Sequence, residues 1–436
     1  MATARQSLEF RGLSETLVLQ VTGAIVLFGF HVISARLLSL QDYGALSFGL
    51  TLGGLLTLGC ALGYPDLLLR VVAGAMHQRT WGILKGIVLQ AVRNVVLLSA
   101  VTVVLLLAAS WLLPGIGRDQ ATGLRIAAVA VAFYPLGFLR AKIARGLGTI
   151  RCSIAPEEIL RPLTFIGLLL LAVGLVGVTP NGDGLAGLLL VSVTIAMIAG
   201  IACVRGHVPF SWASVTSDVR TLEWRRSSRG MMAGGLFQEV ITRSDAVALG
   251  FLATMASTAQ LSACSKLALL NVFLLKVIDS YYAPKMAMAF TSGDNEHLWS
   301  LIRRTAAISF AGSLPVAILL VMFPGPLLAL FGADYQDATL PLQILAVGTL
   351  VNAATGSVGY ALLMSNNERV FAIIAGGVAT GNVAAHLVFT PTFGIVGAAS
   401  ITAISVALQN LLMLVAIVKL LDRRNVSGVV PAGSDG

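Results

Sequence analysis

Polar and charged side chains interrupt an apolar stretch at residues 231–253, and they gather on one side of it. They are Gln238, Glu239, Thr242, Arg243 and Asp245. At about 100° per residue in a helix, these positions share an arc of roughly 160°. Glu239 lies four residues before Arg243, the spacing at which opposite charges pair along a helix. A helix with this face can present a cation and two carboxylates to a cavity or to a neighbouring helix.

The next apolar stretch, 259–283, has a second charged face. It carries Lys266, Lys276 and Asp279. The two lysines would lie about 15 Å apart along a helix axis, so they would line different depths. If the stretch crosses a bilayer, each charge at its centre costs at least about 2.5 kcal/mol unless it meets a partner or a hydrated cavity.

Two interpretations of these charges stay open. In the first, Glu239–Arg243 and Lys276–Asp279 are mutually satisfied pairs that hold two helices together. In the second, both helices line a hydrated central cavity whose cations attract an anionic substrate. The candidate substrate-binding cations are then Arg243, Lys266 and Lys276. The candidate groups for coupling to H⁺ or Na⁺ are Glu239, Asp245 and Asp279.

A weaker polar pair lies on the apolar stretch at 370–390. Asn382 and His386 are one helical turn apart. They could form a proton site, but a hydrogen bond between helices is the more frequent role of such residues in membranes. We therefore expect a structural role for this pair.

Catalytic motifs are missing from the sequence. It has no Walker motif, so ATP hydrolysis by this chain is not expected, and it has no GxSxG or HExxH pattern. The cysteines lack CxxC spacing, so we expect neither a disulfide framework nor a metal site. They are Cys60, Cys152, Cys203 and Cys264. The sequence thus predicts a protein that is not an enzyme and that uses no cofactor.

Composition shows what surrounds these charged faces. Of the 436 residues, 57% are hydrophobic and only 11% are charged, and the mean hydropathy is +0.88. A soluble chain carries about 25% charged residues, which excludes a soluble multidomain protein. The net charge of +9 would suggest nucleic acid in a soluble protein. Here the cations flank apolar stretches, so membrane orientation explains them and no nucleic-acid partner is expected.

Twelve apolar stretches are long enough to cross a bilayer, which takes about 20 residues. The predicted crossings are 15–37, 44–64, 87–113, 123–144, 162–178, 185–204, 231–253, 259–283, 305–330, 340–363, 370–390 and 395–420. The first lacks a signal-peptide cleavage site and is interpreted as a retained helix. The fold class is therefore an all-α polytopic membrane protein with about twelve transmembrane helices.

Lys and Arg residues fall in alternate loops, which fixes the orientation. One side holds 23 of the 29 cations, and the other side holds only Arg36, Arg118 and Arg125. Because cytoplasmic loops are enriched in Lys and Arg, both termini are expected in the cytoplasm. Arg243, Lys266 and Lys276 belong to neither side. The loops on the opposite side are short, which disfavours an enzyme that works in a large external loop.

The chain divides into two groups of six crossings. We predict a first lobe at 1–204, a cytoplasmic linker at 205–230, a second lobe at 231–424 and a flexible tail at 425–436. Residues 38–47, between crossings one and two, correspond in position to 253–262, between crossings seven and eight. Two parallel repeats of this kind around a central cavity are a transporter design.

Short motifs follow one another in order along the whole chain. They are Ala35-Arg36-Leu37-Leu38-Ser39-Leu40-Gln41-Asp42-Tyr43-Gly44, Gly63-Tyr64-Pro65-Asp66, Arg145-Gly146-Leu147-Gly148, Arg243-Ser244-Asp245, Phe331-Gly332-Ala333-Asp334-Tyr335, Val358-Gly359-Tyr360 and Phe393-Gly394-Ile395-Val396-Gly397-Ala398-Ala399. This pattern resembles bacterial polysaccharide flippases of the multidrug/oligosaccharidyl-lipid/polysaccharide exporter superfamily. It departs from the family at Met255, where Pro is common, and at Ala259, where Gly is usual.

The resemblance implies two six-helix lobes around a central cavity, working by alternating access in the bacterial inner membrane. It implies a flippase that moves an undecaprenyl-pyrophosphate-linked oligosaccharide from the cytoplasmic to the periplasmic leaflet. Such a flippase serves surface polysaccharide biosynthesis, including the O-antigen of lipopolysaccharide. The implied partners are this lipid-linked oligosaccharide, membrane lipids, H⁺ or Na⁺, and polysaccharide assembly proteins.

Two other functions are weighed against this one. An ion-coupled multidrug exporter of the same superfamily would favour an acidic, aromatic cavity for cationic drugs, whereas the two charged faces here contain three cations. A membrane glycan polymerase or ligase would need a sizeable external loop. The short external loops make that function the least favoured.

Overall fold

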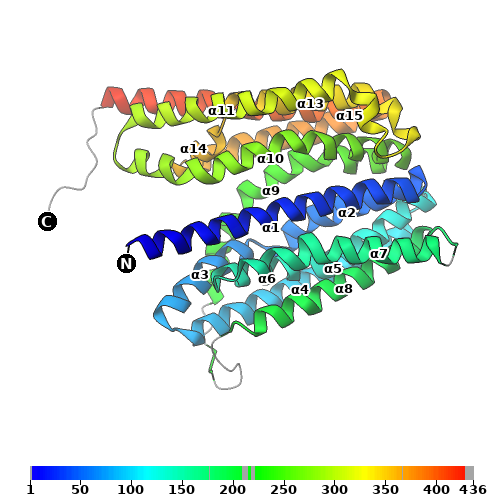
Figure 1. Ribbon diagram of the computed structural model, residues 1–436, viewed down its shortest axis with the longest axis horizontal. Coiled ribbons are helices and arrows are strands. Elements are labelled where there is room, and N and C mark those ends of the chain that lie inside the picture. The colour runs from blue at the N-terminus through cyan, green and yellow to red at the C-terminus, as the bar shows by residue number, and fades with distance from the viewer. Residues whose placement is uncertain (1, 176, 209–214, 218–220, 366, 428–436) are drawn as a thin grey trace. The chain divides into compact units, whose positions relative to one another are not determined.

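The computed structural model describes the backbone of residues 2–175, 177–208, 215–217, 221–365 and 367–427. The side chains of 2–14, 221–234, 273, 274, 276, 277, 280 and 422–427 lie outside the described residues. Helices make up most of the described backbone, and it contains no strand (Figure 1). The predicted all-α fold class is confirmed.

The chain forms two compact units, Met1–Ala233 and Gly234–Gly436. The first unit contains α1 (Ala2–Leu37), α2 (Leu40–Ala61), α3 (Tyr64–Gln78), α4 (Trp81–Leu112), α5 (Arg118–Gly146), α6 (Ile150–Ile154), the π-helical η1 (Ala155–Leu160), α7 (Arg161–Gly174) and α8 (Gly182–Arg205). α9 (Thr221–Leu252) leads into the second unit. There follow α10 (Met255–Thr291), α11 (Asn295–Met322), α12 (Pro324–Leu328), the 3-10 helix η2 (Ala333–Ala338), α13 (Thr339–Thr355), α14 (Val358–Met364) and α15 (Glu368–Ser427).

The helices supply the expected number of membrane crossings. Among the described residues, nine helical segments are long and apolar enough to cross a bilayer, and the last of them, Glu368–Leu421, contains two crossings. α9 and α10, with 32 and 37 residues, are each long enough to cross as well. The fold therefore accommodates about twelve transmembrane helices.

The predicted second crossing, 44–64, is followed directly by a separate helix. After α2, Leu62 and Gly63 adopt left-handed backbone conformations with φ of 51° and 71°. α3 then begins at Tyr64 with Pro65 in its first turn, a position that suits proline because its missing N–H has no intrahelical partner there. Apolar residues continue across this break, so hydropathy alone placed the end of the second crossing too late.

The fifth crossing begins earlier than the predicted 162–178. It is continuous over Ile150–Leu175 and passes through the π-helical turn η1. Pro156 and Pro162 lie in this region, and each removes a backbone donor from the hydrogen-bond ladder. Charged residues in this turn lower the mean hydropathy there, so the hydropathy pattern did not show the first part of the crossing.

The tenth crossing is also broken. α13 ends at Thr355, and Gly356 has φ 67° before α14 begins. A Cβ at Gly356 would lie 2.7 Å from the backbone nitrogen of Ala306, so only glycine allows this approach of α13 to α11. The predicted helix 340–363 is therefore two helices.

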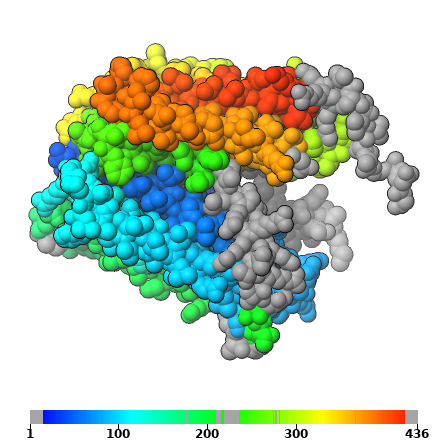
Figure 2. Space-filling model, turned by 180° about the vertical axis from the view of Figure 1, so that it is seen from behind, coloured from blue at the N-terminus to red at the C-terminus, as the bar shows by residue number. Residues whose placement is uncertain are grey.

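The last two predicted crossings form a hairpin within α15. Gly394, with φ 55° and ψ −135°, separates its two halves. The amide of Asn382 on the first half donates to the hydroxyl of Ser405 on the second, at 2.9 Å. Figure 2 shows the two halves, in light orange and red, side by side on one face of the second unit. This agrees with the predicted crossings 370–390 and 395–420.

The two matched junctions of the predicted repeat share one construction. A break of two residues separates α1 from α2 and α9 from α10. In each case the second residue of the break caps the following helix through its hydroxyl: Ser39 accepts from the Asp42 N–H, and Thr254 accepts from the Ser257 N–H. The correspondence inferred from position thus extends to the local geometry.

α2 and α5 make the most extensive helix contact in the first unit. A Cβ at Gly49 would lie 2.5 Å from the carbonyl oxygen of Gly123, and one at Gly53 would lie 2.6 Å from Ala130 Cβ. Glycines four residues apart permit such contact between membrane helices. This contact fixes α5, which carries the charged residues described below.

The cysteines depart from the prediction. Cys152 and Cys203 form a disulfide with their Cα atoms 5.7 Å apart, so the expectation of no disulfide is wrong. The pair is 51 residues apart in sequence and becomes adjacent because α6 packs beside the end of α8. His207 Nδ1 lies 3.9 Å from Cys152 Sγ. The ligand atoms of these three residues lie within 4.8 Å of one another, a grouping that the sequence analysis did not anticipate.

Candidate functional site

The predicted ion pair on α9 is present. The carboxylate of Glu239 accepts from Nε of Arg243 one turn away. The two side chains are 36% and 44% exposed, so the pair is open to its surroundings on one side. An exposed pair of this kind is held weakly, which leaves the guanidinium able to exchange its carboxylate for another anion.

Asp245, on the same helix, lies in a closed environment. Its side chain is 4% exposed, and it accepts a hydrogen bond of 2.7 Å from the N–H of Ala246. Lys266 of α10 is near enough to interact electrostatically with its carboxylate. Lys266 in turn interacts electrostatically with Arg243. The structure therefore brings together three of the predicted site residues.

This cluster of Arg243, Asp245 and Lys266 joins α9 to α10. Its charges are two cations and one buried carboxylate, with Glu239 alongside Arg243. Glu239 and Arg243 share a face of α9 because they are four residues apart, and Lys266 lies in the first third of α10. We refer to Arg243, Asp245, Lys266 and Glu239 as the α9–α10 cluster.

Uncharged polar residues fix the geometry around the α9–α10 cluster. Ser244 donates to the Oδ1 of Asn382, whose amide continues to Ser405. Gln409 donates to the Oε1 of Gln238 at 2.7 Å. These bonds attach α9 to both halves of α15, which confirms the structural role expected for Asn382. His386 bonds instead to Thr390 of its own helix, at 3.0 Å.

The remaining predicted residues lie elsewhere on α10. Asp279 is 7% exposed and accepts a hydrogen bond from Ser357, in the break between α13 and α14. The side chain of Lys276 lies outside the described residues, and so does the predicted Lys276–Asp279 pair. Asp279 therefore has a hydrogen-bond partner in the break between two neighbouring helices, which the sequence did not indicate.

The first unit contains a charged group that the sequence analysis missed. Arg140 on α5 is 6% exposed and lies 3.3 Å from the carboxylate of Glu157 in η1. Arg161 lies 3.5 Å from the same carboxylate and stacks over the ring of Tyr134, 4.5 Å from its centroid. We refer to Arg140, Glu157, Arg161 and Tyr134 as the α5–η1 cluster. Here two cations share one carboxylate.

Two glycines make room for the α5–η1 cluster. A Cβ at Gly137 would lie 2.5 Å from Glu157 Oε1, and a Cβ at Gly200 of α8 would lie 2.6 Å from Cζ of Arg140. Arg140 and Arg161 are among the 23 cations that the sequence pattern placed in the loops of one side. The signal that could have corrected this count is Glu157, an acidic residue among the basic ones, together with small residues on the facing helices.

The family comparison identifies the type of chain. The model of the family described as "Polysaccharide biosynthesis protein" matches residues 10–289. A search of curated proteins finds no significant match.

Solved structures show the fold. The chain aligns with an inward-facing multidrug-resistance MATE family transporter of the MOP superfamily with a TM-score of 0.75 and 15% identity, covering 94% of this chain and 96% of that one. It aligns with the lipid II flippase MurJ, in an inward closed conformation, with a TM-score of 0.64 and 12% identity over 94% and 90% of the two chains. The bent form of the Vibrio cholerae transporter VcmN gives 0.58 and 14% over 95% and 98%.

Proposed function

Because the chain belongs to the polysaccharide biosynthesis protein family, we propose that it is a flippase for a lipid-linked oligosaccharide. Its substrate would be an undecaprenyl-pyrophosphate-linked oligosaccharide, moved from the cytoplasmic to the periplasmic leaflet of the bacterial inner membrane by alternating access. Both termini would lie in the cytoplasm. The product would enter surface polysaccharide assembly, such as that of the O-antigen of lipopolysaccharide, with the assembly proteins as partners.

The observation that carries this proposal is the α9–α10 cluster. Lys266 interacts electrostatically with Arg243 and with the buried carboxylate of Asp245, and Arg243 pairs with the partly exposed carboxylate of Glu239. Two cations in a protein interior of low dielectric attract an anion far more strongly than the same cations in water. A pyrophosphate offers several oxygens to a guanidinium, which binds phosphate in a bidentate manner. In this proposal Arg243 and Lys266 bind the pyrophosphate or acidic sugars, and Lys276 contributes at another depth.

Glu239 can compete with the substrate for Arg243 and so favour the release of the substrate. Its carboxylate pairs with Arg243 in the structure, so an arriving pyrophosphate would compete with it for the guanidinium. Binding of H⁺ or Na⁺ to Glu239 would weaken the ion pair and favour the anionic substrate. Asp245 would bind the ion in the same way beside Lys266, and Asp279 is the third candidate. Coupling to an ion gradient then follows from competition for shared charges.

A second candidate function is an ion-coupled multidrug exporter. The likeness to a MATE family transporter supports this candidate through the fold alone. A cationic drug would be repelled by Arg243 and Lys266 unless both were neutralised. Drug-resistance assays in a strain that lacks its own exporters separate the two functions, since only an exporter raises the tolerated concentration of cationic drugs. A membrane glycan polymerase or ligase stays the least favoured function.

Glycan export in a flippase-null bacterial strain tests the proposal in cells. The wild-type chain is expected to restore export, whereas Arg243→Ala and Lys266→Ala reduce it at least tenfold at equal membrane abundance. Arg303→Ala, which removes an exposed cation from α11, is the matched control and should export normally. Wild-type export by both cluster variants would show that these cations do not bind the substrate.

A further inference from the structure

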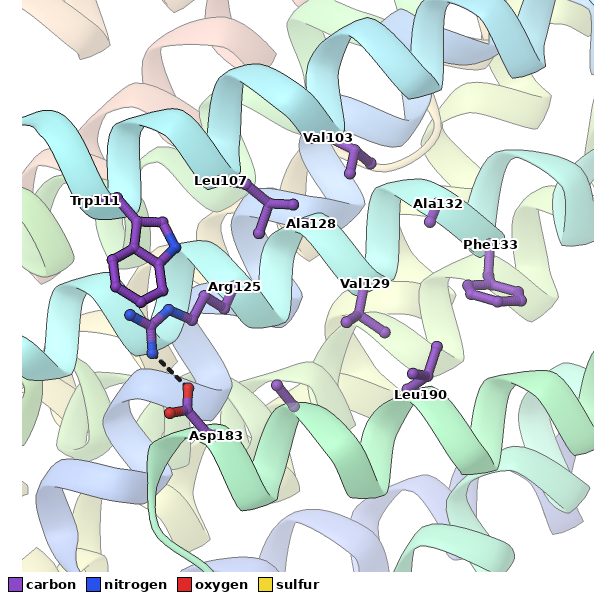
Figure 3. A pocket seen from close by; sticks show the side chains of 11 residues that line it. Val103, Leu107, Trp111, Arg125, Ala128, Val129, Ala132, Phe133, Asp183 and Leu190 are labelled. Carbon is purple, nitrogen blue, oxygen red and sulfur yellow. Dashed lines mark hydrogen bonds and ion pairs between the residues drawn. The ribbon is translucent and has the colours of Figure 1, made fainter.

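An apolar slot runs between α4, α5 and α8 in the first unit, and it has one charged end (Figure 3). Its volume is about 460 Å³. Leu107, Val129, Phe133 and Leu190 line its length. Every residue that lines the slot belongs to the first unit, so the slot is separate from the α9–α10 cluster.

Alanines create the space. Ala128 and Ala132 of α5 and Ala186 of α8 lie along the slot, where larger side chains would fill it. The walls carry exposed apolar groups: Leu107 is 39% exposed and Leu190 is 43% exposed. On a membrane-crossing bundle such groups face lipid rather than water. The apolar length of the slot therefore suits a hydrocarbon chain.

Three side chains build the charged end. Nη1 of Arg125 donates to Asp183, and its guanidinium lies 4.7 Å from the centroid of the Trp111 ring. Figure 3 shows the indole over the guanidinium, which points to the carboxylate. Arg125 is 23% exposed, whereas Asp183 is 77% and Trp111 is 75% exposed. The end is thus open, and both signs of charge can be reached.

The position of this end along the helices corresponds to a membrane surface. Trp111 is in the last turn of α4, and Asp183 is in the first turn of α8. Tryptophan is enriched at the level of lipid headgroups. A lipid whose chain occupies the slot would place its headgroup beside Arg125 and Asp183.

The charges select one kind of headgroup. An anionic lipid would meet the carboxylate of Asp183, and a cationic one would meet Arg125. A zwitterionic headgroup satisfies both, with its phosphate at the guanidinium and its ammonium at the carboxylate. A guanidinium has five N–H donors, and one is directed to Asp183, so Arg125 can hold the carboxylate and a phosphate oxygen together.

We propose that this slot is a binding site for one acyl chain of a zwitterionic phospholipid with a primary ammonium, such as phosphatidylethanolamine. The phosphate binds Arg125, the ammonium binds Asp183, and Trp111 covers the headgroup. The lipid fills the slot between α4, α5 and α8 and holds these helices in register. This role differs from that of the transported lipid and does not depend on it.

Lipid retention by the purified full-length chain tests the proposal. The delipidated protein is mixed with phosphatidylethanolamine, phosphatidylcholine or phosphatidylglycerol, and bound lipid is counted by native mass spectrometry. Phosphatidylethanolamine should be retained at least several-fold more than either of the others. Phosphatidylcholine has the same phosphate but no N–H to donate to Asp183, and phosphatidylglycerol has no cation.

Variants of the protein test the binding of the headgroup and the binding of the acyl chain separately. Asp183→Asn should abolish the preference for phosphatidylethanolamine over phosphatidylcholine. Ala132→Leu should fill the slot and reduce retention of every phospholipid about tenfold, with the headgroup residues intact. Val104→Leu, at a 64% exposed position on α4 that does not line the slot, is the control and should bind as the wild type does. Elution as a monodisperse peak confirms that each variant is folded.

Two results would overturn the proposal. The first is equal retention of the three phospholipids by the wild-type protein, because the charged end of the slot would then not discriminate between headgroups. The second is unchanged retention of phospholipid by folded Ala132→Leu, because the acyl chain of the lipid would then lie outside the slot. Failure of glycan export would leave this test unaffected, since lipid retention is measured on purified protein without transport.

Discussion

Gly200→Ala is the substitution whose consequence the structure defines best. The added Cβ would lie 2.6 Å from Cζ and Nε of Arg140, against about 3.5–4.0 Å for a favourable contact between carbon atoms. The guanidinium would have to move by about 1 Å. It already lies 3.3 Å from the carboxylate of Glu157, so a shift of this size disturbs the geometry of the buried pair.

The magnitude follows from two opposing terms. Breaking a buried ion pair costs about 3–5 kcal/mol, and the lower end applies because Glu157 is 23% exposed. Alanine recovers about 1 kcal/mol relative to glycine within a helix. Gly187→Ala, also on α8, has no atom within 4 Å of its new Cβ and gains the helical term alone. The two variants should therefore differ by up to about 3 kcal/mol, at most roughly a hundredfold in the unfolding equilibrium.

The assay is unfolding in mixed micelles with a rising fraction of sodium dodecyl sulfate, followed by tryptophan fluorescence. Gly200→Ala should unfold at a distinctly lower fraction than the wild type, and Gly187→Ala at an equal or higher one. In a Glu157→Gln background the ion pair is already lost, so Gly200→Ala should cost much less there. Equal stability of the two alanine variants would refute the tight enclosure of Arg140.

Three further results are expected. Gly49→Ala should destabilise the α2–α5 contact by about 1–3 kcal/mol through overpacking, since its Cβ would lie 2.5 Å from a carbonyl oxygen. Gly59→Ala is the control, because its Cβ meets nothing within 4 Å. Unfolding curves of the two variants that coincide would contradict this prediction. Asn382→Ala should cost about 0.6–1.7 kcal/mol, the range for hydrogen bonds between membrane helices, measured by the same unfolding assay. Cys152 and Cys203, which form a disulfide in this structure, lie on the cation-rich side that we assign to the cytoplasm. Because cytosolic disulfides are usually transient, the bond should open in untreated cells, so maleimide should label both cysteines there and neither after a thiol oxidant; a pair that stays oxidised in untreated cells would argue for the opposite orientation.

Much of the fold could be read from the sequence because the bilayer imposes simple rules. A crossing needs a long apolar run with its backbone donors satisfied internally, so the number of crossings and the hairpin at Gly394 were predictable. Helix breaks inside an apolar run were not. Gly356 and Gly63 leave hydropathy unchanged, and the break at each depends on a left-handed backbone conformation, at Gly356 also on the approach of α11.

The charged residues divide in the same way. The pairing of Glu239 with Arg243 was predictable because both lie on one helix at a fixed spacing. The approach of Lys266 to Asp245, and the bond from Ser357 to Asp279, depend on how separate helices pack. The α5–η1 cluster was missed because Arg140 and Arg161 lie near the ends of crossings. In the sequence they cannot be distinguished from the arginines that set the orientation in the membrane. The spacing of Glu157 and Arg161 is also four residues and could have been read from the sequence, but only the structure shows that Arg140 of α5 reaches the same carboxylate.

The central claim is translocation of a lipid-linked oligosaccharide, and reconstitution tests it most directly. The purified chain is placed in liposomes with a fluorescent undecaprenyl-pyrophosphate-linked oligosaccharide, and an impermeant quencher reports the leaflet that each label occupies. The wild-type chain should move label between leaflets, and Arg243→Ala and Lys266→Ala should slow this movement at least tenfold. Liposomes with the wild-type chain that show no more movement than empty ones, yet export a cationic drug along an ion gradient, would contradict the proposed function.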